Sequence, residues 1–141
     1  MGQVVFLLQT WYVFYMNAHY FRREEAAAFT VPGGTTGVIY PSHPHGEHTI
    51  AHVSMKGAYP DSGYSINDRC TETLFMLSGS FAVRVDEKVY HLEKGDELII
   101  LPGSKYRIEG EGEALDLITP SWDKAQNKLV ADETFTIATK N

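Results

Sequence analysis

Four short runs of β-forming residues, all lying between Thr71 and Arg107, constrain the fold of this chain more than any other feature. The runs cover residues 71–79, 81–85, 89–96 and 97–103, and each is rich in Val, Ile, Leu, Phe or Tyr. Gly or Pro-Gly punctuates them at nearly regular intervals, which is the pattern of an antiparallel β-barrel or β-sandwich. Because many short strands must hide their edges, closure into a barrel is the favoured outcome.

The same reasoning divides the 141 residues into one barrel domain with two flanking segments. We expect the barrel at 17–130, an apolar N-terminal extension or added strand at 1–16, and a C-terminal tail at 131–141 that forms a strand at 134–139. A short helical turn is expected within 17–29 and a turn-rich connection at 57–69. The predicted strands are 35–40, 49–56, 70–77, 80–85, 88–92, 97–101, 104–109 and 113–119. The predicted core includes Leu74, Met76, Leu98, Ile100 and Ile108.

Composition narrows the partners and the cellular compartment. The net charge is −6 and the 12 Lys and Arg residues are scattered, so nucleic acid is not an expected partner. The single cysteine, Cys70, excludes an intramolecular disulfide and fits a reducing cytoplasm. The apolar run at 1–15 is too short to span a bilayer and lacks the flanks of a secretory signal. We therefore expect no membrane partner, and we expect this run to be buried in a homodimer.

The motifs resemble those of the cupin family over roughly residues 35–120. The resemblance is carried by Glu72 and Gly79, then Gly95-Asp96, then Pro102-Gly103, in that order. It implies an all-β, double-stranded β-helix (jelly-roll) barrel with a ligand pocket inside, in a protein that is commonly a dimer.

The family's metal ligands are replaced in this chain. Metal-binding cupins supply a His-x-His pair before the glutamate and a third histidine after Pro-Gly, whereas this chain has Ser65, Asn67 and Tyr106 at the matching positions. Hydroxyl and amide groups are poor ligands for transition metals, so we expect neither a metal nor another cofactor. The resemblance instead indicates a polar pocket of Ser65, Asn67, Glu72 and Tyr106 that binds a small sugar or organic acid. His52 is a further candidate for the ligand-binding set. A buried, self-satisfied hydrogen-bond network at these positions is the alternative.

The histidines leave two further hypotheses open. His52 lies within a predicted strand, and it would be the best general base of the chain if it faced inward with Glu72 or Tyr106. A metal-free isomerase, epimerase or lyase acting on a carbohydrate derivative would use these three residues. A metalloenzyme would instead use His43, His45, His48 and His52, although the first three lie in an irregular loop with Pro44 and Gly46. His91 is expected at the surface, and Trp122 is expected to pack the tail against the barrel.

Overall fold

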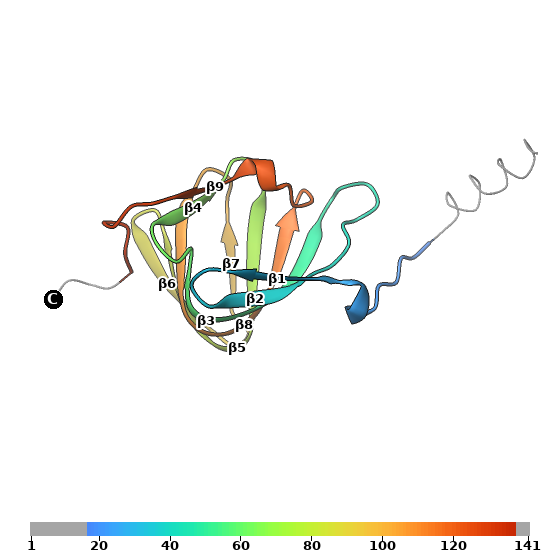
Figure 1. Ribbon diagram of the computed structural model, residues 1–141, viewed down its shortest axis with the longest axis horizontal. Coiled ribbons are helices and arrows are strands. Elements are labelled where there is room, and N and C mark those ends of the chain that lie inside the picture. The colour runs from blue at the N-terminus through green and yellow to red at the C-terminus, as the bar shows by residue number, and fades with distance from the viewer. Residues whose placement is uncertain (1–16, 138–141) are drawn as a thin grey trace, which may run out of the picture.

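Two long antiparallel strands, β5 (Thr71–Val85) and β8 (Lys105–Thr119), form the spine of the fold. They pair along nearly their whole length, from Thr71 opposite Thr119 to Val85 opposite Tyr106. This computed structural model describes residues 17–137, and Figure 1 shows how the shorter strands continue the curled sheet around the two long ones. The shorter elements are η1 (Arg23–Glu25), β1 (Ala27–Val31), β2 (Thr35–Ile39), β3 (Thr49–Tyr59), β4 (Tyr64–Asn67), β6 (Lys88–Glu93), β7 (Glu97–Ile100), η2 (Lys124–Gln126) and β9 (Asn127–Val130).

All observed pairings are antiparallel. One side of the barrel runs β1-β2-β3-β8, β8 also pairs with β4, and β4 pairs with β9. On the other side β5 pairs with β8, β6 and β7. Among the described residues no helix is long and apolar enough to cross a membrane.

The glycines that were expected to separate strands lie instead at bends within continuous strands. The runs predicted at 70–77 and 80–85 are one strand, β5, and those at 104–109 and 113–119 are one strand, β8. Gly79 has φ +71° and Gly110 has φ +143°, and a Cβ at either position would lie within 2.3 Å of a carbonyl oxygen on the facing strand. A bulge between Met76 and Ser78 adds to the bend. The two glycines therefore let β5 and β8 curl without breaking their pairing.

The motif residues are mainly turn formers. In the turn between β6 and β7, the Gly95 amide donates to the Met76 carbonyl at 2.9 Å, and the Met76 amide donates to the Asp96 carbonyl at 3.0 Å. Gly103, in the turn before β8, has φ +82° and donates its amide to the Asn67 carbonyl at 2.8 Å. These contacts explain why the motif predicts the fold well.

Four of the five predicted core residues are buried, namely Leu74, Met76, Ile100 and Ile108, and Leu98 is partly buried against them. Other expectations were wrong. Residues 64–67 form β4 inside the predicted turn-rich connection, and 27–31 form β1 where at most a helical turn was expected. Residues 131–137 contain no strand, and Phe135 there packs on Tyr64 and under the Arg84 guanidinium instead. The predictions for 1–16 and 138–141 lie outside the described residues.

Candidate functional site

A cavity of about 350 Å³ lies inside the barrel. Its walls come from β1, β2, β3, β5 and β8, and from Trp122 just after β8. Most of the lining is apolar: Phe29, Val31, Ile39, Ala51, Val53, Met55, Leu74, Phe81, Ile108, Ala114, Ile118 and Trp122. Five polar residues complete it, namely Thr35, Tyr59, Glu72, Tyr106 and Asp116. An apolar cavity with a few polar groups has the general character of a small-molecule site.

Two acidic residues face each other diagonally across the spine of the barrel. Glu72 on β5 pairs with Ile118 on β8, and Leu74 pairs with Asp116, so the two acids are one alternate position apart on the same face. Burial raises the pKa of Glu72, against the opposing influence of the nearby Tyr106 and Asn67 side chains. Burial, followed by the negative charge of Glu72, raises the pKa of Asp116 well above its ordinary value. Asp116 is therefore the acid that keeps its proton, and Glu72 is the first of the two to ionise.

Two tyrosines stand beside the acids. Tyr106 is only 1% exposed, and its ring centroid lies 6.2 Å from that of Tyr59. Burial and the neighbouring Glu72 charge raise the pKa of Tyr106 well above its usual range, and burial raises the pKa of Tyr59. Both phenols are therefore neutral hydrogen-bond donors near neutral pH.

Three polar atoms of the cavity lining are buried without a hydrogen-bond partner in the described part of the chain. They are Thr35 Oγ1, Tyr106 Oη and Asp116 Oδ1. Buried polar atoms are satisfied in the great majority of native structures. These three atoms are thus the groups of the cavity that a bound molecule would satisfy.

The structure brings only part of the predicted polar set into the cavity. Glu72 and Tyr106 line it, whereas Ser65 and Asn67 do not. The side-chain amide of Asn127 donates to Ser65 Oγ at 2.8 Å and to Asn67 Oδ1 at 2.9 Å. The side-chain amide of Gln126 donates to the same Asn67 oxygen at 3.0 Å. Ser65 and Asn67 therefore fasten β4 to β9, which matches the alternative of a self-satisfied network for these two residues.

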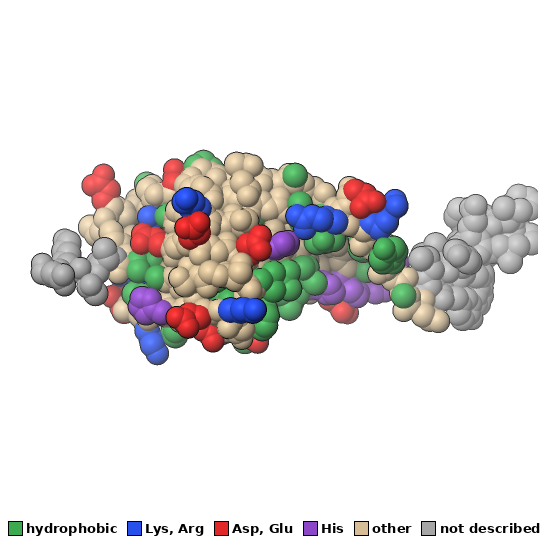
Figure 2. Space-filling model, turned by 90° about the horizontal axis from the view of Figure 1, so that it is seen from below, with side chains coloured by type: hydrophobic (Ala, Val, Ile, Leu, Met, Phe, Trp, Pro, Cys, Tyr) green, Lys and Arg blue, Asp and Glu red, His purple; other side chains and the backbone are tan. Residues whose placement is uncertain are grey.

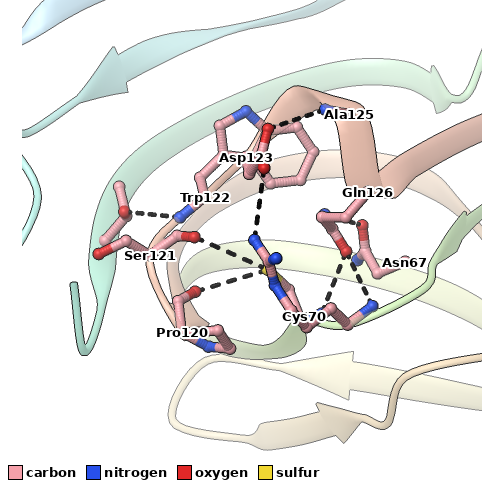
Figure 3. Close-up of polar contacts among 10 residues, drawn as sticks. Asn67, Cys70, Pro120, Ser121, Trp122, Asp123, Ala125 and Gln126 are labelled. Atoms are coloured by element: carbon pink, nitrogen blue, oxygen red, sulfur yellow. Dashed lines mark hydrogen bonds and ion pairs between the residues drawn. The ribbon is translucent and has the colours of Figure 1, made fainter.

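Figure 3 shows how this network continues to the end of the barrel. The Gln126 side-chain oxygen, Oε1, accepts hydrogen bonds from the backbone amides of Arg69 and Cys70, at 3.2 and 3.0 Å. The Cys70 thiol points to the carbonyls of Pro120 and Ser121. Cys70 is fully buried, and burial raises the pKa of its thiol. A buried thiol with a raised pKa serves packing rather than nucleophilic chemistry.

His52 requires a correction, because it does not reach the cavity. Ala51 and Val53, its neighbours on β3, line the cavity, so strand alternation points His52 to the outer face. There its Nδ1 atom lies 3.2 Å from the Arg23 guanidinium, and its Nε2 atom lies 3.9 Å from the Glu113 carboxylate. The predicted trio of His52, Glu72 and Tyr106 is therefore not assembled.

The loop histidines lie close together outside the cavity. The His43 ring centroid is 5.6 Å from that of His45 and 5.2 Å from that of His48, and the His43 Nδ1 atom accepts the His45 backbone amide. Within residues 17–137 no three His, Cys, Asp or Glu side chains are arranged to hold a metal ion. At the positions of the family's histidine ligands, Ser65 and Asn67 are already committed to Asn127. The residues present thus do not fit the cupin metal centre, and the four-histidine alternative is not assembled.

Sequence reasoning missed Asp116, Tyr59 and Trp122. Asp116 lies between Leu115 and Leu117, and the signal that could have found it is its parity. Residues 106, 108, 114, 116 and 118 of β8 all face the cavity. Trp122 lines this cavity and a second one of about 290 Å³ beside it, and its backbone amide donates to Thr49 Oγ1 at 2.9 Å.

Comparison with known proteins gives the fold its name. No family model and no curated protein matches the chain. Among solved structures, Pac13 from Streptomyces, solved with uridine, is 17% identical, with a TM-score of 0.73 over 85% of this chain and 98% of that one. An RmlC-like cupin from Shewanella frigidimarina is 18% identical, with a TM-score of 0.63 over 77% of this chain and 96% of that one. KdgF from Halomonas sp. is 17% identical, with a TM-score of 0.62 over 77% of this chain and 99% of that one. The chain has the cupin jelly-roll fold, and the fold class predicted from its sequence is confirmed.

Proposed function

We propose that the protein binds a small polar molecule inside its barrel, without a metal ion. The observation that carries this proposal is the cavity itself, with apolar walls and the cluster of Glu72, Asp116, Tyr59 and Tyr106. Its volume of about 350 Å³ suits a molecule of the size of a monosaccharide or a nucleoside. The donor set supports metal independence, because the described lining offers carboxyl and phenol groups and no imidazole.

The structural neighbours support a binding barrel in a general way. Pac13 is described as a nucleoside dehydratase and was solved with uridine. At 17% identity this likeness supports the shape of the barrel. The ligand preference of this chain depends on the residues of its own cavity.

A thermal-shift screen against sugars, nucleosides and organic acids tests the proposal, because a ligand specific to the folded state raises apparent stability by mass action. A true hit should lose most of its effect in Tyr106→Phe and Glu72→Gln. It should keep its effect in the matched control His52→Gln, which changes a ring on the outer face of the same barrel. A hit that survives both cavity substitutions would place the ligand elsewhere and refute the proposed site.

A second candidate function is a metal-free lyase or isomerase that acts on a carbohydrate derivative. The arrangement that favours it is an ionised Glu72 beside a protonated Asp116 in one cavity, since such a pair supplies a general base and a general acid. Tyr59 and Tyr106 would donate to an oxygen that develops charge. Replacing either acid by its amide should then abolish turnover of a substrate found in the screen, while His52→Gln retains it. Full turnover in both amide variants would show that the reaction does not use this acid pair, and a wild-type chain that converts none of its ligands would leave binding alone as the function.

We also propose that the chain forms a homodimer. The sequence-based reason, the apolar run at 1–15, lies outside the described residues. The outer sheet face adds an independent reason. There Ile50, Phe75, Ile99, Leu115 and Leu117 form a continuous apolar area over four strands, with 36–54% of each residue exposed. A face of this kind is typical of an interface between subunits.

The remaining partner expectations stay predictions. On the face shown in Figure 2, Lys and Arg side chains are interleaved with Asp and Glu, so positive charge is not concentrated there. Such a surface gives no reason to revise the expectation that nucleic acid is not a partner. Location in the cytoplasm also stays a prediction.

A further inference from the structure

The charge of the cavity is one-sided. Glu72 and Asp116 are both part of the lining, and no Lys, Arg or His is present among the described residues that form it. Within residues 17–137, no nearby cationic side chain lowers the pKa of Glu72 or of Asp116. A ligand in this cavity therefore meets two acidic side chains and no basic side chain among the described residues.

The unpartnered atoms define what the ligand must offer. Tyr106 Oη is a phenol that can donate, Thr35 Oγ1 can donate or accept, and Asp116 Oδ1 belongs to a carboxyl group. They come from two different strands, β2 and β8, on the inner face of the barrel. Alcohol groups match all three, because a hydroxyl both donates and accepts. The aromatic walls of Phe29, Phe81 and Trp122 suit the apolar face of a sugar ring or a flat base.

Resting on the proposed function, we propose that the cavity takes hydroxyl-bearing molecules that carry no negative charge, such as neutral sugars or nucleosides, and excludes their carboxylate and phosphate derivatives. The sequence left two ligand classes open, sugars and organic acids. The proposed selection keeps the sugars as candidate ligands and excludes the organic acids. An anion would bring a negative charge next to the carboxyl groups of Glu72 and Asp116, without a basic side chain in the described lining to pair with. Such like-charge placement is a common means of rejecting a wrong ligand.

Matched ligands that differ only in charge test this selection by calorimetric titration of the full chain. One series is galactose, galacturonate and galactosamine, and a second is uridine and uridine 5′-monophosphate. We expect a neutral member to bind, and its anionic counterpart to bind about tenfold or more weakly. In Glu72→Gln the anion should recover much of this difference, whereas in His52→Gln the difference should remain. Asp116→Asn serves as a second variant, and circular dichroism verifies that each variant is folded.

The outcomes separate this inference from the proposed function. An anion that binds as tightly as its neutral partner, or a neutral–anion difference that is unchanged in Glu72→Gln, overturns the charge selection while leaving binding in the barrel intact. Galactosamine, which carries a positive charge, should bind at least as tightly as galactose, and markedly weaker binding overturns the charge selection. A binder whose affinity ignores every cavity substitution refutes the proposed site, and the inference falls with it.

Discussion

The inner and outer faces of β5 and β8 each carry a few residues that burial alone would place on the other face. On the inner face of β8, Asp116 points into the cavity between Ala114 and Ile118. On the outer face of the same strand, Leu115 and Leu117 are 38% and 36% exposed. β5 repeats the contrast, with Glu72 inside and Phe75 outside.

The difference shows that stability of the monomer alone does not determine which residues occupy the two faces. Two acids inside a mostly apolar barrel weaken the fold unless something compensates for their desolvation, so their presence indicates function rather than packing. Exposed leucines beside them do not help a monomer, which is the reason for the proposal that a second subunit covers them.

The two faces should differ most in how much a truncation to alanine lowers the free energy of unfolding. Met76 is fully buried in the core, so Met76→Ala should lower the free energy of unfolding by about 2–5 kcal/mol. Leu117→Ala on the outer face should cost less than about 1 kcal/mol when the chain is monomeric. Urea unfolding at low protein concentration measures both values. Equal losses would mean that the outer face is as much a core as the inner one.

A second test concerns the outer face as an interface. Leu117→Lys should weaken self-association by about tenfold or more, because it places a charge in the centre of the apolar area. Leu129→Lys is the matched control, since Leu129 is also exposed but lies on β9, away from this area. Sedimentation equilibrium over a range of concentrations makes the comparison. A wild-type chain that stays monomeric throughout refutes the dimer.

The smallest expected effect is on the inner face and depends on pH. The pKa of Asp116 is raised in the folded protein, so its contribution to stability is complete below about pH 4 and is lost as the pH rises through the folded value. Asp116→Asn removes this loss and should stabilise the protein near pH 7 by about 1 kcal/mol, with little gain at pH 4. Thermal unfolding across this range measures the effect.

The matched control for this prediction is Glu113→Gln, a carboxyl on the outer face of the same strand. Its exposed pairing with His52 is weak, so a change of less than about 0.5 kcal/mol is expected at either pH. A destabilised Asp116→Asn at pH 7 would show that the charged acid supports the fold.

The fold could be predicted from the sequence because its signals are local. Gly95, Asp96 and Gly103 are turn residues with specific backbone contacts, and turn chemistry can be read without a structure. The alternation of side chains along β3 separates Ala51, Val53 and Met55, which line the cavity, from His52. Nothing in that strand says which set faces inward, because both faces carry apolar residues.

The site was harder to predict because its residues depend on long-range pairing. Asp116 is hidden between two leucines, and hydrophobicity alone would send those leucines inward and the acid outward. Ser65 and Asn67 looked available for a ligand because β9, whose Asn127 occupies them, was not predicted. Glu72 and Tyr106 were found through the family resemblance, which aligns positions rather than environments.

The central claim is that a small molecule binds on the inner face of the barrel, between Glu72, Asp116 and Tyr106. Heteronuclear NMR of the labelled chain, titrated with the best neutral ligand from the screen, tests it most directly. The account predicts the largest shift changes at Thr35, Tyr106 and Asp116, with the amides of Ile50, Phe75 and Leu129 nearly unmoved. Changes concentrated at Ile50, Leu115 and Leu117, with the cavity residues unmoved, would place the binding surface on the outer face and contradict the claim.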